Sequence, residues 1–203
     1  MHMKALAVIL GTILFAVLGS VAYIVYDSKI EGKNQQLNSD VRLVTQEGVN
    51  ISLSALYTRP SIVFFGFTHC SKVCPTTLSK LDGWLKKVDP TGKLLNAYFI
   101  TVDPKRDTPE EMNKFVKKFS DRIIGISGDP TSVMSVVKKF RVYVNNVLTD
   151  QSDPEKKYFV DHTTALLLFN TSGNIVGIIP YKEDSQFAIE KINRLMEQEK
   201  YLK

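Results

Sequence analysis

The sequence predicts an α/β protein with a mixed sheet flanked by helices, preceded by an N-terminal transmembrane helix. Three observations predict this class: an uncharged apolar run near the start, an alternation of strand-like and helix-like segments after it, and a turn between the last two strand-like segments. Alternating strands and helices are typical of a partly parallel sheet covered on both faces, and a closing hairpin makes the sheet mixed.

The first element is the apolar run at residues 5–26, which contains no charged side chain. A helix of about 20 such residues spans a bilayer. A cleavable signal peptide is the alternative, because Ser20 and Ala22 form a small-x-small pair, but its apolar region is usually only about 7 to 15 residues long. We therefore expect an uncleaved anchor, with residues 1–4 as a tail before it and the polar residues 27–40 as a tether after it.

The next elements alternate between the two periodicities. A short apolar run at residues 62–67 predicts a buried strand, and Pro75 suits the first turn of the helix that follows. A second strand is expected at residues 97–102, and Thr108 and Glu111 form a capping box for the next helix. The residues predicted to face inward are Leu78, Leu81, Trp84, Leu85 and Val88 in the first helix and Met112, Phe115, Val116 and Phe119 in the second.

The remaining elements complete the sheet. A third strand is expected at residues 123–127, and Asp129 precedes a third helix. The segments 165–169 and 175–179 flank a polar turn and predict a hairpin, and a last helix begins at about Ser185. The order is then βαβαβαββα.

This order is a thioredoxin-like plan for residues 41–203. Residues 145–157 fit neither periodicity and are predicted to form an exposed, irregular loop. The net charge of +5 is carried by lysines that are dispersed among acidic residues, with no block of five or six like charges. The sequence therefore predicts a solvated lysine-rich surface and no nucleic-acid partner.

The two cysteines of the chain, Cys70 and Cys74, carry its most specific chemistry. They are too close in sequence for a distributed disulfide framework, so a redox pair or a metal pair remains. Cys74 is expected at a helix N-terminus, whose partial positive charge favours the thiolate. Thiolates select Cu(I), Zn or iron–sulfur clusters, and two cysteines exclude a cluster held by four. A metal site would need a third ligand.

Two histidines that follow the membrane span could supply that ligand. His69 adjoins Cys70, so its ring is expected to point away from a shared ion. His162 precedes the strand at residues 165–169, which in a thioredoxin-like sheet starts beside the cysteine loop. A buried histidine satisfied by the backbone is the alternative for His162, but its pairing with two thiols favours a metal ligand.

Three motifs occur in order: Gly-Phe-Thr-His-Cys-x-x-x-Cys-Pro at residues 66–75, Thr-Val-Asp-Pro-x-Arg-Asp-Thr-Pro at residues 101–109, and Val-Asp-His-Thr at residues 160–163. From residue 41 to its C-terminus the chain resembles the Sco/SenC family of copper chaperones for cytochrome c oxidase assembly. One departure is that Ser71 and Lys72 stand where family members often carry proline and an acidic residue.

The resemblance implies a site in which Cys70, Cys74 and His162 bind copper as Cu(I) or Cu(II), and in which the two cysteines can also form a redox disulfide. It implies delivery of copper, received from an unidentified donor, to the binuclear copper centre of cytochrome c oxidase subunit II, with thiol–disulfide chemistry on that subunit as a side activity rather than a main enzymatic function. It further implies a domain in the bacterial periplasm, anchored in the inner membrane, or in the mitochondrial intermembrane space.

Three side chains are expected to surround these ligands without binding the ion: Asp103, His69 and Asp161. Asp107 and Thr108 are interpreted chiefly as caps of the following helix.

Two other classes use the same residues. A membrane-anchored thiol–disulfide oxidoreductase or peroxidase would use the cysteine pair as its redox centre, but thioredoxin-type proteins have CxxC and a proline before the facing strand, where this chain has CxxxC and His162. A tethered interaction domain would keep only a structural disulfide, which closes a very small loop and stabilises little. Copper binding by the reduced protein separates these classes.

Overall fold

The computed structural model describes residues 11, 13–29, 41–148 and 158–200. Contacts divide the chain into two units, Met1–Asp40 and Val41–Lys203. In the first unit residues 13–29 are helical. Among the described residues no helix combines the length and the apolar character needed to cross a bilayer. The span expected at residues 5–26 includes residues 5–10 and 12, which lie outside the described part.

The second unit is built on a seven-stranded mixed sheet with the strand order β2-β1-β5-β4-β3-β8-β9. Its strands are β1 (Leu43–Thr45), β2 (Asn50–Ile51), β3 (Ser61–Gly66), β4 (Asn96–Thr101), β5 (Ile123–Gly128), β8 (Leu166–Phe169) and β9 (Ile175–Ile179). The central strands β3, β4 and β5 are parallel, whereas β1 and β8 join them antiparallel. The predicted mixed sheet is therefore confirmed.

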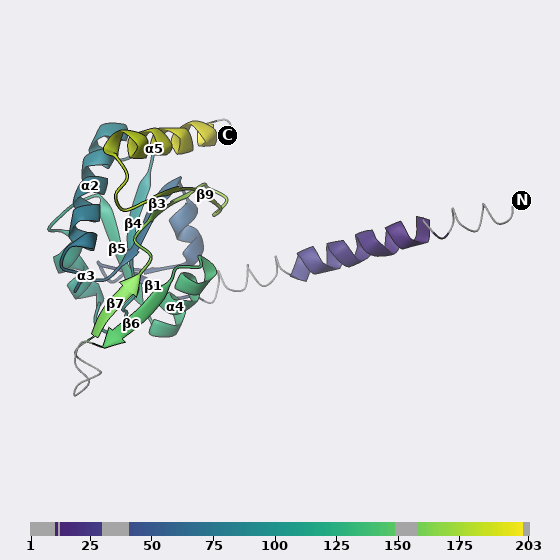
Figure 1. The fold of residues 1–203 in the computed structure, drawn as a ribbon, viewed down its shortest axis with the longest axis horizontal. Helices are drawn as coiled ribbons and strands as arrows, with labels where there is room; N and C mark the ends of the chain where they lie inside the picture. Colours follow the sequence, from purple (N-terminus) through teal and green to yellow (C-terminus); the bar gives the residue numbers. More distant parts are fainter. Residues whose placement is uncertain (1–10, 12, 30–40, 149–157, 201–203) are drawn as a thin grey trace, which may run out of the picture. The chain divides into compact units, whose positions relative to one another are not determined.

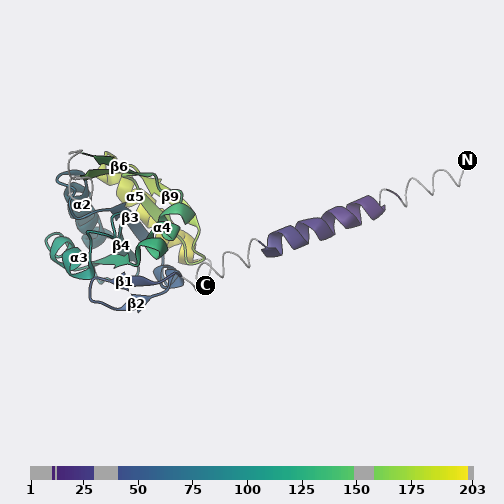
Figure 2. The ribbon, with the colours of Figure 1, turned by 90° about the horizontal axis from the view of Figure 1, so that it is seen from below.

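Helices cover both faces of this sheet (Figures 1 and 2). They are α2 (Val73–Val88), α3 (Pro109–Val116), α4 (Pro130–Lys139) and α5 (Ser185–Lys200), with the 3-10 helix η1 (Leu53–Tyr57). On one face, Phe115 of α3 stacks on Phe99 of β4, which stacks in turn on Phe64 of β3. On the other face, Phe140 at the end of α4 packs against Phe65.

Local sequence explains where the helices begin. Thr108 caps α3, because its hydroxyl accepts a hydrogen bond from the Glu111 N–H at 3.3 Å. Asp129 caps α4 through the Ser132 N–H at 2.9 Å. The predicted capping role of Thr108 and the predicted helix start after Asp129 are thus confirmed.

The predicted order was incomplete at two places. The short strands β1 and β2 were not predicted, and neither was a two-stranded antiparallel sheet of β6 (Val144–Leu148) and β7 (Tyr158–His162). The prediction of an irregular loop at residues 145–157 is wrong for residues 145–148, which pair with β7. Residues 149–157 lie outside the described part.

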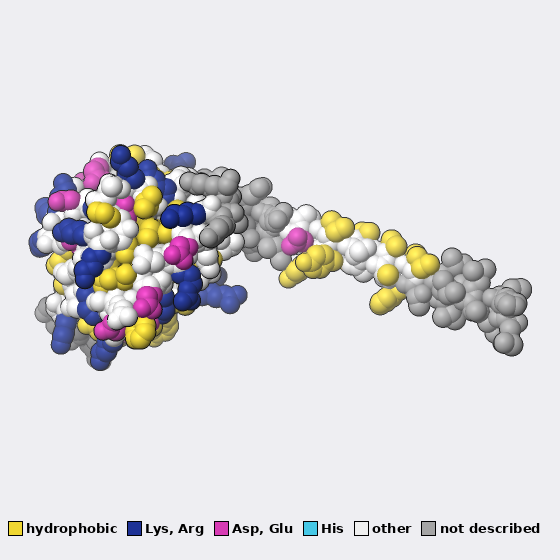
Figure 3. All heavy atoms as spheres, turned by 90° about the horizontal axis from the view of Figure 1, so that it is seen from above, with side chains coloured by type: hydrophobic (Ala, Val, Ile, Leu, Met, Phe, Trp, Pro, Cys, Tyr) yellow, Lys and Arg dark blue, Asp and Glu magenta, His cyan; other side chains and the backbone are white. Residues whose placement is uncertain are grey.

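The surface agrees with the dispersed charge of the sequence. On the face shown in Figure 3, Lys and Arg side chains are spread among acidic and uncharged ones instead of forming one basic patch.

Candidate metal centre

The cysteines lie in the turn that connects β3 to α2. Cys70 is in the loop and Cys74 in the first turn of the helix, and both are free and buried. The backbone N–H of Cys74 donates to the Cys70 Sγ at 3.4 Å, so the turn itself brings the second residue onto the first sulfur. Gly66 makes room for this packing, because a Cβ at this position would lie 2.8 Å from the Cys74 Sγ.

His162 meets the cysteines from the end of β7. Its side chain is buried, and its Nε2 lies 3.8 Å from the Cys74 Sγ. Its Nδ1 lies 2.8 Å from the Thr163 carbonyl oxygen, which can only accept, so this nitrogen carries the proton. With Nδ1 held in this way, the Nε2 is the nitrogen that faces the sulfurs, which is how a metal-binding imidazole is normally oriented.

Aromatic rings fix the orientation of this imidazole. The ring of Phe67, directly after β3, meets it edge to face at 5.7 Å between centroids, and the ring of Phe64 lies 6.3 Å away. The β3 strand therefore leads into the cysteine loop and also supplies one wall for His162.

The two thiols have opposite acidities. A hydrogen bond from Cys74 lowers the pKa of Cys70 to about 4, against the opposing effect of burial, and hydrogen bonds from the backbone of Cys74 and Lys72 also lower it. The same hydrogen bond, together with burial, raises the pKa of Cys74. At neutral pH the pair thus holds one thiolate, on Cys70, beside one thiol.

The donor set suits a soft metal ion. The 3.8 Å between the Cys74 Sγ and the His162 Nε2 can be bridged by one ion with ligand bonds of about 2.0 to 2.3 Å. Even so, in the part of the chain that the structure describes, no three His, Cys, Asp or Glu side chains are already arranged as a complete metal site. The Cys74 sulfur and the His162 ring therefore lie close together beside Cys70 without forming a complete site.

The arrangement of the cysteines and His162 agrees with a comparison of the sequence with models of protein families. The family model described as SCO1/SenC matches residues 30–197. The chain belongs to the SCO1/SenC family.

Curated SCO1/SenC relatives match mainly the folded unit. The protein SCO1 homolog 1, mitochondrial, of Arabidopsis thaliana is 34% identical over 135 residues, which are 66% of this chain and 39% of the relative. The SCO2-like protein RC0895 of Rickettsia conorii is 32% identical over 140 residues, 69% of this chain and 67% of the relative. The chain thus spans about two fifths of the plant protein's length.

Solved structures of SCO1/SenC members share the fold. Arabidopsis thaliana ScoI with copper bound is 28% identical at a TM-score of 0.69, covering 77% of this chain and 96% of that one. Bradyrhizobium japonicum ScoI with copper bound is 33% identical at a TM-score of 0.68, covering 76% and 96%.

The three side chains expected around the predicted ligands make their hydrogen bonds with other residues. His69 is half exposed, and its Nδ1 lies 3.1 Å from the Thr68 hydroxyl, so its ring points away as its sequence neighbourhood suggested. Asp161 is exposed, because alternate residues of β7 face outward. Asp103 is buried but bonds Tyr158 and Arg106. No described hydrogen bond joins any of the three to the predicted ligands.

Asp107 has a role that the sequence did not indicate. Its interpretation as a helix cap is wrong, since Thr108 caps α3. The fully buried Asp107 carboxylate instead accepts from the Thr68 N–H at 3.0 Å and from the hydroxyls of Thr68 and Thr101, each at 2.6 Å. Burial raises the pKa of this carboxyl. Asp107 therefore ties the start of the cysteine loop to β4, and its only sequence signal is its place in the second motif.

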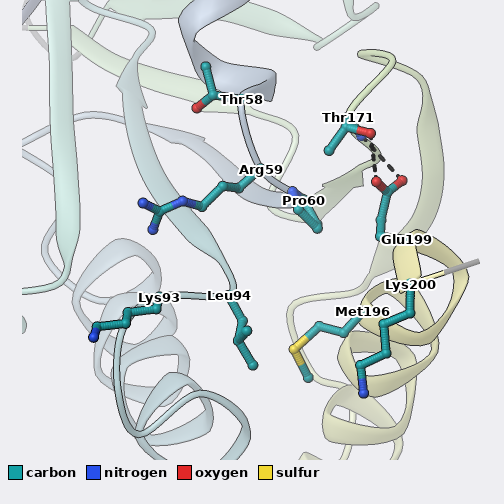
Figure 4. A pocket seen from close by; sticks show the side chains of 9 residues that line it. All are labelled: Thr58, Arg59, Pro60, Lys93, Leu94, Thr171, Met196, Glu199 and Lys200. Atoms are coloured by element: carbon teal, nitrogen blue, oxygen red, sulfur yellow. Dashed lines mark hydrogen bonds between the residues drawn. The ribbon is translucent and has the colours of Figure 1, made fainter. Parts of the chain in front are cut away.

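A pocket at the opposite ends of β3 and β4 offers no comparable chemistry (Figure 4). It contains neither a thiol nor an imidazole, and the Glu199 carboxylate in it accepts hydrogen bonds from Thr171. Its lining residues are Thr58, Arg59, Pro60, Lys93, Leu94, Thr171, Met196, Glu199 and Lys200. The two cysteine thiols thus lie near the carboxyl end of β3, away from this pocket.

Proposed function

We propose that this chain is a copper chaperone in which Cys70, Cys74 and His162 bind the ion. The observation that carries the proposal is the convergence of two free, buried sulfurs and an imidazole Nε2 from a distant strand. Membership of the SCO1/SenC family supports it, as do the copper-bound structures of the plant and Bradyrhizobium japonicum relatives.

The acidities of the thiols suggest an order of binding. The Cys70 thiolate offers the first soft ligand at neutral pH without losing a proton. Binding of the cation then favours loss of the Cys74 proton, because a coordinated thiol is deprotonated. His162 closes the site with Nε2 while its Nδ1–H stays on the Thr163 carbonyl. Both cysteines must be reduced, since a disulfide leaves no thiolate to bind the ion.

The recipient that we propose is the binuclear copper centre of cytochrome c oxidase subunit II, with an unidentified protein as copper donor. The proposal includes an anchor at residues 5–26, which holds the domain in the bacterial periplasm at the inner membrane or in the mitochondrial intermembrane space. Residues 27–40 then serve as the tether between anchor and domain. Cell fractionation with protease protection would test this topology.

Copper binding by the full chain tests the proposal directly. The reduced protein should bind one equivalent of Cu(I) in competition with a chromogenic chelator, and the disulfide form should not. A His162→Ala change should weaken binding by at least the 10- to 100-fold that is lost when only a supporting group of a metal site is removed. Tight binding of one equivalent by the oxidised protein would contradict the proposal.

A second candidate function is thiol–disulfide exchange on the cysteines of subunit II. The lowered pKa of Cys70 beside a second thiol favours it, because the thiolate is the attacking species. His162→Ala separates the two functions: exchange with a disulfide-containing peptide should survive the change, whereas copper binding should fall.

A further inference from the structure

The strand that carries His162 is attached to the domain in an unusual way. Among the described strands β7 pairs only with β6, so no ladder of backbone hydrogen bonds fixes it to the seven-stranded sheet. At its far end the chain continues into β8, which belongs to that sheet. Relative to that sheet, the position of its first described residue, Tyr158, therefore depends on side-chain contacts.

Arg106, in the loop between β4 and α3, makes that attachment. Its Nη1 donates to the Tyr158 carbonyl at 3.1 Å, and its guanidinium carbon lies 3.8 Å from the centroid of the Tyr158 ring. Its Nε donates to the Asp103 carboxylate, which also accepts the Tyr158 hydroxyl at 2.6 Å. Burial and the bond to Asp103 raise the pKa of Tyr158 to about 12, so this hydroxyl remains a donor at neutral pH.

Arg106, Asp103 and Tyr158 each contact the other two. These contacts hold both the main chain and the side chain of Tyr158. The Arg106 and Asp103 side chains are only 18% and 4% exposed, so solvent screens their pairing little. The Nη2 of Arg106 is buried without a hydrogen-bond partner among the described residues. A buried donor left unpaired costs stability, so the described contacts do not satisfy the Arg106 guanidinium completely.

We propose that Arg106 is a positioning residue for His162. Arg106 holds Tyr158, the first residue of β7, and thereby keeps the Nε2 of His162, the last residue of β7, directed toward the two sulfurs. The inference rests on the proposed function. Between the two ends, Val160 is fully buried and the Phe159 ring meets Phe67 edge to face at 5.6 Å between centroids. A shift at Tyr158 would therefore be transmitted along a short, extended segment to the imidazole.

Geometry, and not charge, is what Arg106 supplies. The Asp103 carboxylate neutralises the guanidinium, so Arg106 contributes little net charge to the thiols. Lysine keeps a positive charge but lacks a planar guanidinium group. Only such a group can lie over the Tyr158 ring and donate hydrogen bonds in two directions at once. An Arg106→Lys change should therefore fail to preserve the position of His162.

The experiment uses the full chain, reduced and purified in detergent. Cu(I) affinity is measured by chelator competition for the wild type, Arg106→Lys, His162→Ala and the double variant. We expect Arg106→Lys to bind about 10- to 100-fold more weakly and the double variant to bind no more weakly than His162→Ala. In the copper-free protein, hydrogen exchange of the amides at residues 159–162 should be faster in Arg106→Lys.

Arg122→Lys is a matched control. Arg122 is also a partly buried arginine, and it pairs with the Asp89 carboxylate at 2.9 Å, beside the C-terminal end of α2. Its change should lower the stability of the domain while leaving copper affinity and the exchange at residues 159–162 at wild-type values.

Three results would overturn the inference: wild-type exchange in Arg106→Lys, fully additive losses of affinity in the double variant, or an equal loss of affinity in Arg122→Lys. If the wild type itself fails to bind copper, the proposed function falls. The exchange measurement then still decides whether Arg106 holds β7, because it needs no metal.

Discussion

β3 and β7 both end at the candidate metal centre, yet the domain holds them in different ways. β3 lies between β4 and β8, and all six of its residues are buried. β7 has one neighbour, β6, and alternate residues of it are exposed. The cysteines that follow β3 are thus positioned by the core, whereas His162 depends on a few side-chain contacts. Damage to the histidine side of the centre should therefore be possible without unfolding the domain.

The cysteine side of this comparison should give the largest effect. Cys70→Ser or Cys74→Ser removes a sulfur that the core holds in place, so no neighbouring group can replace it. We expect Cu(I) affinity to fall by more than about 100-fold, beyond the loss usual for supporting groups. Chelator competition measures this, and circular dichroism should show an unchanged fold. A Cys74→Ser protein with wild-type affinity would remove this residue from the site.

The stability of the sheet should depend on groups far from β7, of which Asp89 is the clearest. Burial alone would raise the pKa of Asp89, but N–H donors at residues 93–95 and the Thr91 hydroxyl hold it below its ordinary value of 3.8. The stabilisation is therefore present above that value and is lost as the pH falls through the lower pKa of the folded state.

Asp89→Asn should accordingly cost about 3 kcal/mol of unfolding free energy at pH 7, as expected for one partner of a buried ion pair. Urea unfolding between pH 7 and pH 3 should show a flatter pH dependence for the variant than for the wild type. Copper affinity at pH 7 should not change. An equally steep pH profile in both proteins would show that Asp89 is not the group responsible.

Gly66→Ala tests how tightly the core holds the cysteine loop. A Cβ at residue 66 would lie 2.6 Å from the Phe99 ring and 2.8 Å from the Cys74 Sγ, so both must move. We expect a loss of about 2 kcal/mol, which is usual for overpacking, together with weaker copper binding. Gly83→Ala is the control, since nothing lies within 4 Å of a Cβ there. Equal stability of the two variants would show that the cysteine loop can shift to accommodate the added Cβ without a cost in stability.

The smallest effect should come from the outer face of the hairpin. Phe159 is 46% exposed and contacts Phe67 through its ring edge. Phe159→Ala should cost about 1 kcal/mol, the order of a single aromatic pair, with a measurable increase in hydrogen exchange along β7. A loss as large as that of Asp89→Asn would mean that the hairpin belongs to the cooperative core, contrary to the comparison drawn above.

The same contrast explains what the sequence could predict of the fold. The central strands were predicted within one or two residues, because buried parallel strands are continuous apolar runs. The hairpin was missed because β6 contains Asn145 and Asn146, and β7 contains Asp161 and His162, so neither shows such a run. A strand with one neighbour and a solvated face can carry polar residues that a central strand cannot.

The residues of the candidate site could be predicted only where a short sequence motif or a neighbouring predicted strand indicated them. Cys70 and Cys74 are recognisable by their spacing at a strand-to-helix junction. His162 was inferred from its place before β8, and the structure brings it to Cys74. The contacts of Arg106 and Asp107 could not be inferred, since they join segments separated by 52 and 39 residues that only the folded sheet brings together.

Between the two buried cysteines, the side chains of Ser71 and Lys72 are exposed. Their replacement requires no repacking of the interior, so these two positions are free to diverge while the sulfurs stay in place. A short stretch of exposed surface beside the two cysteines can thus be altered independently of the sulfurs, and we expect variants at Ser71 and Lys72 to change contacts with partner proteins without moving the cysteines.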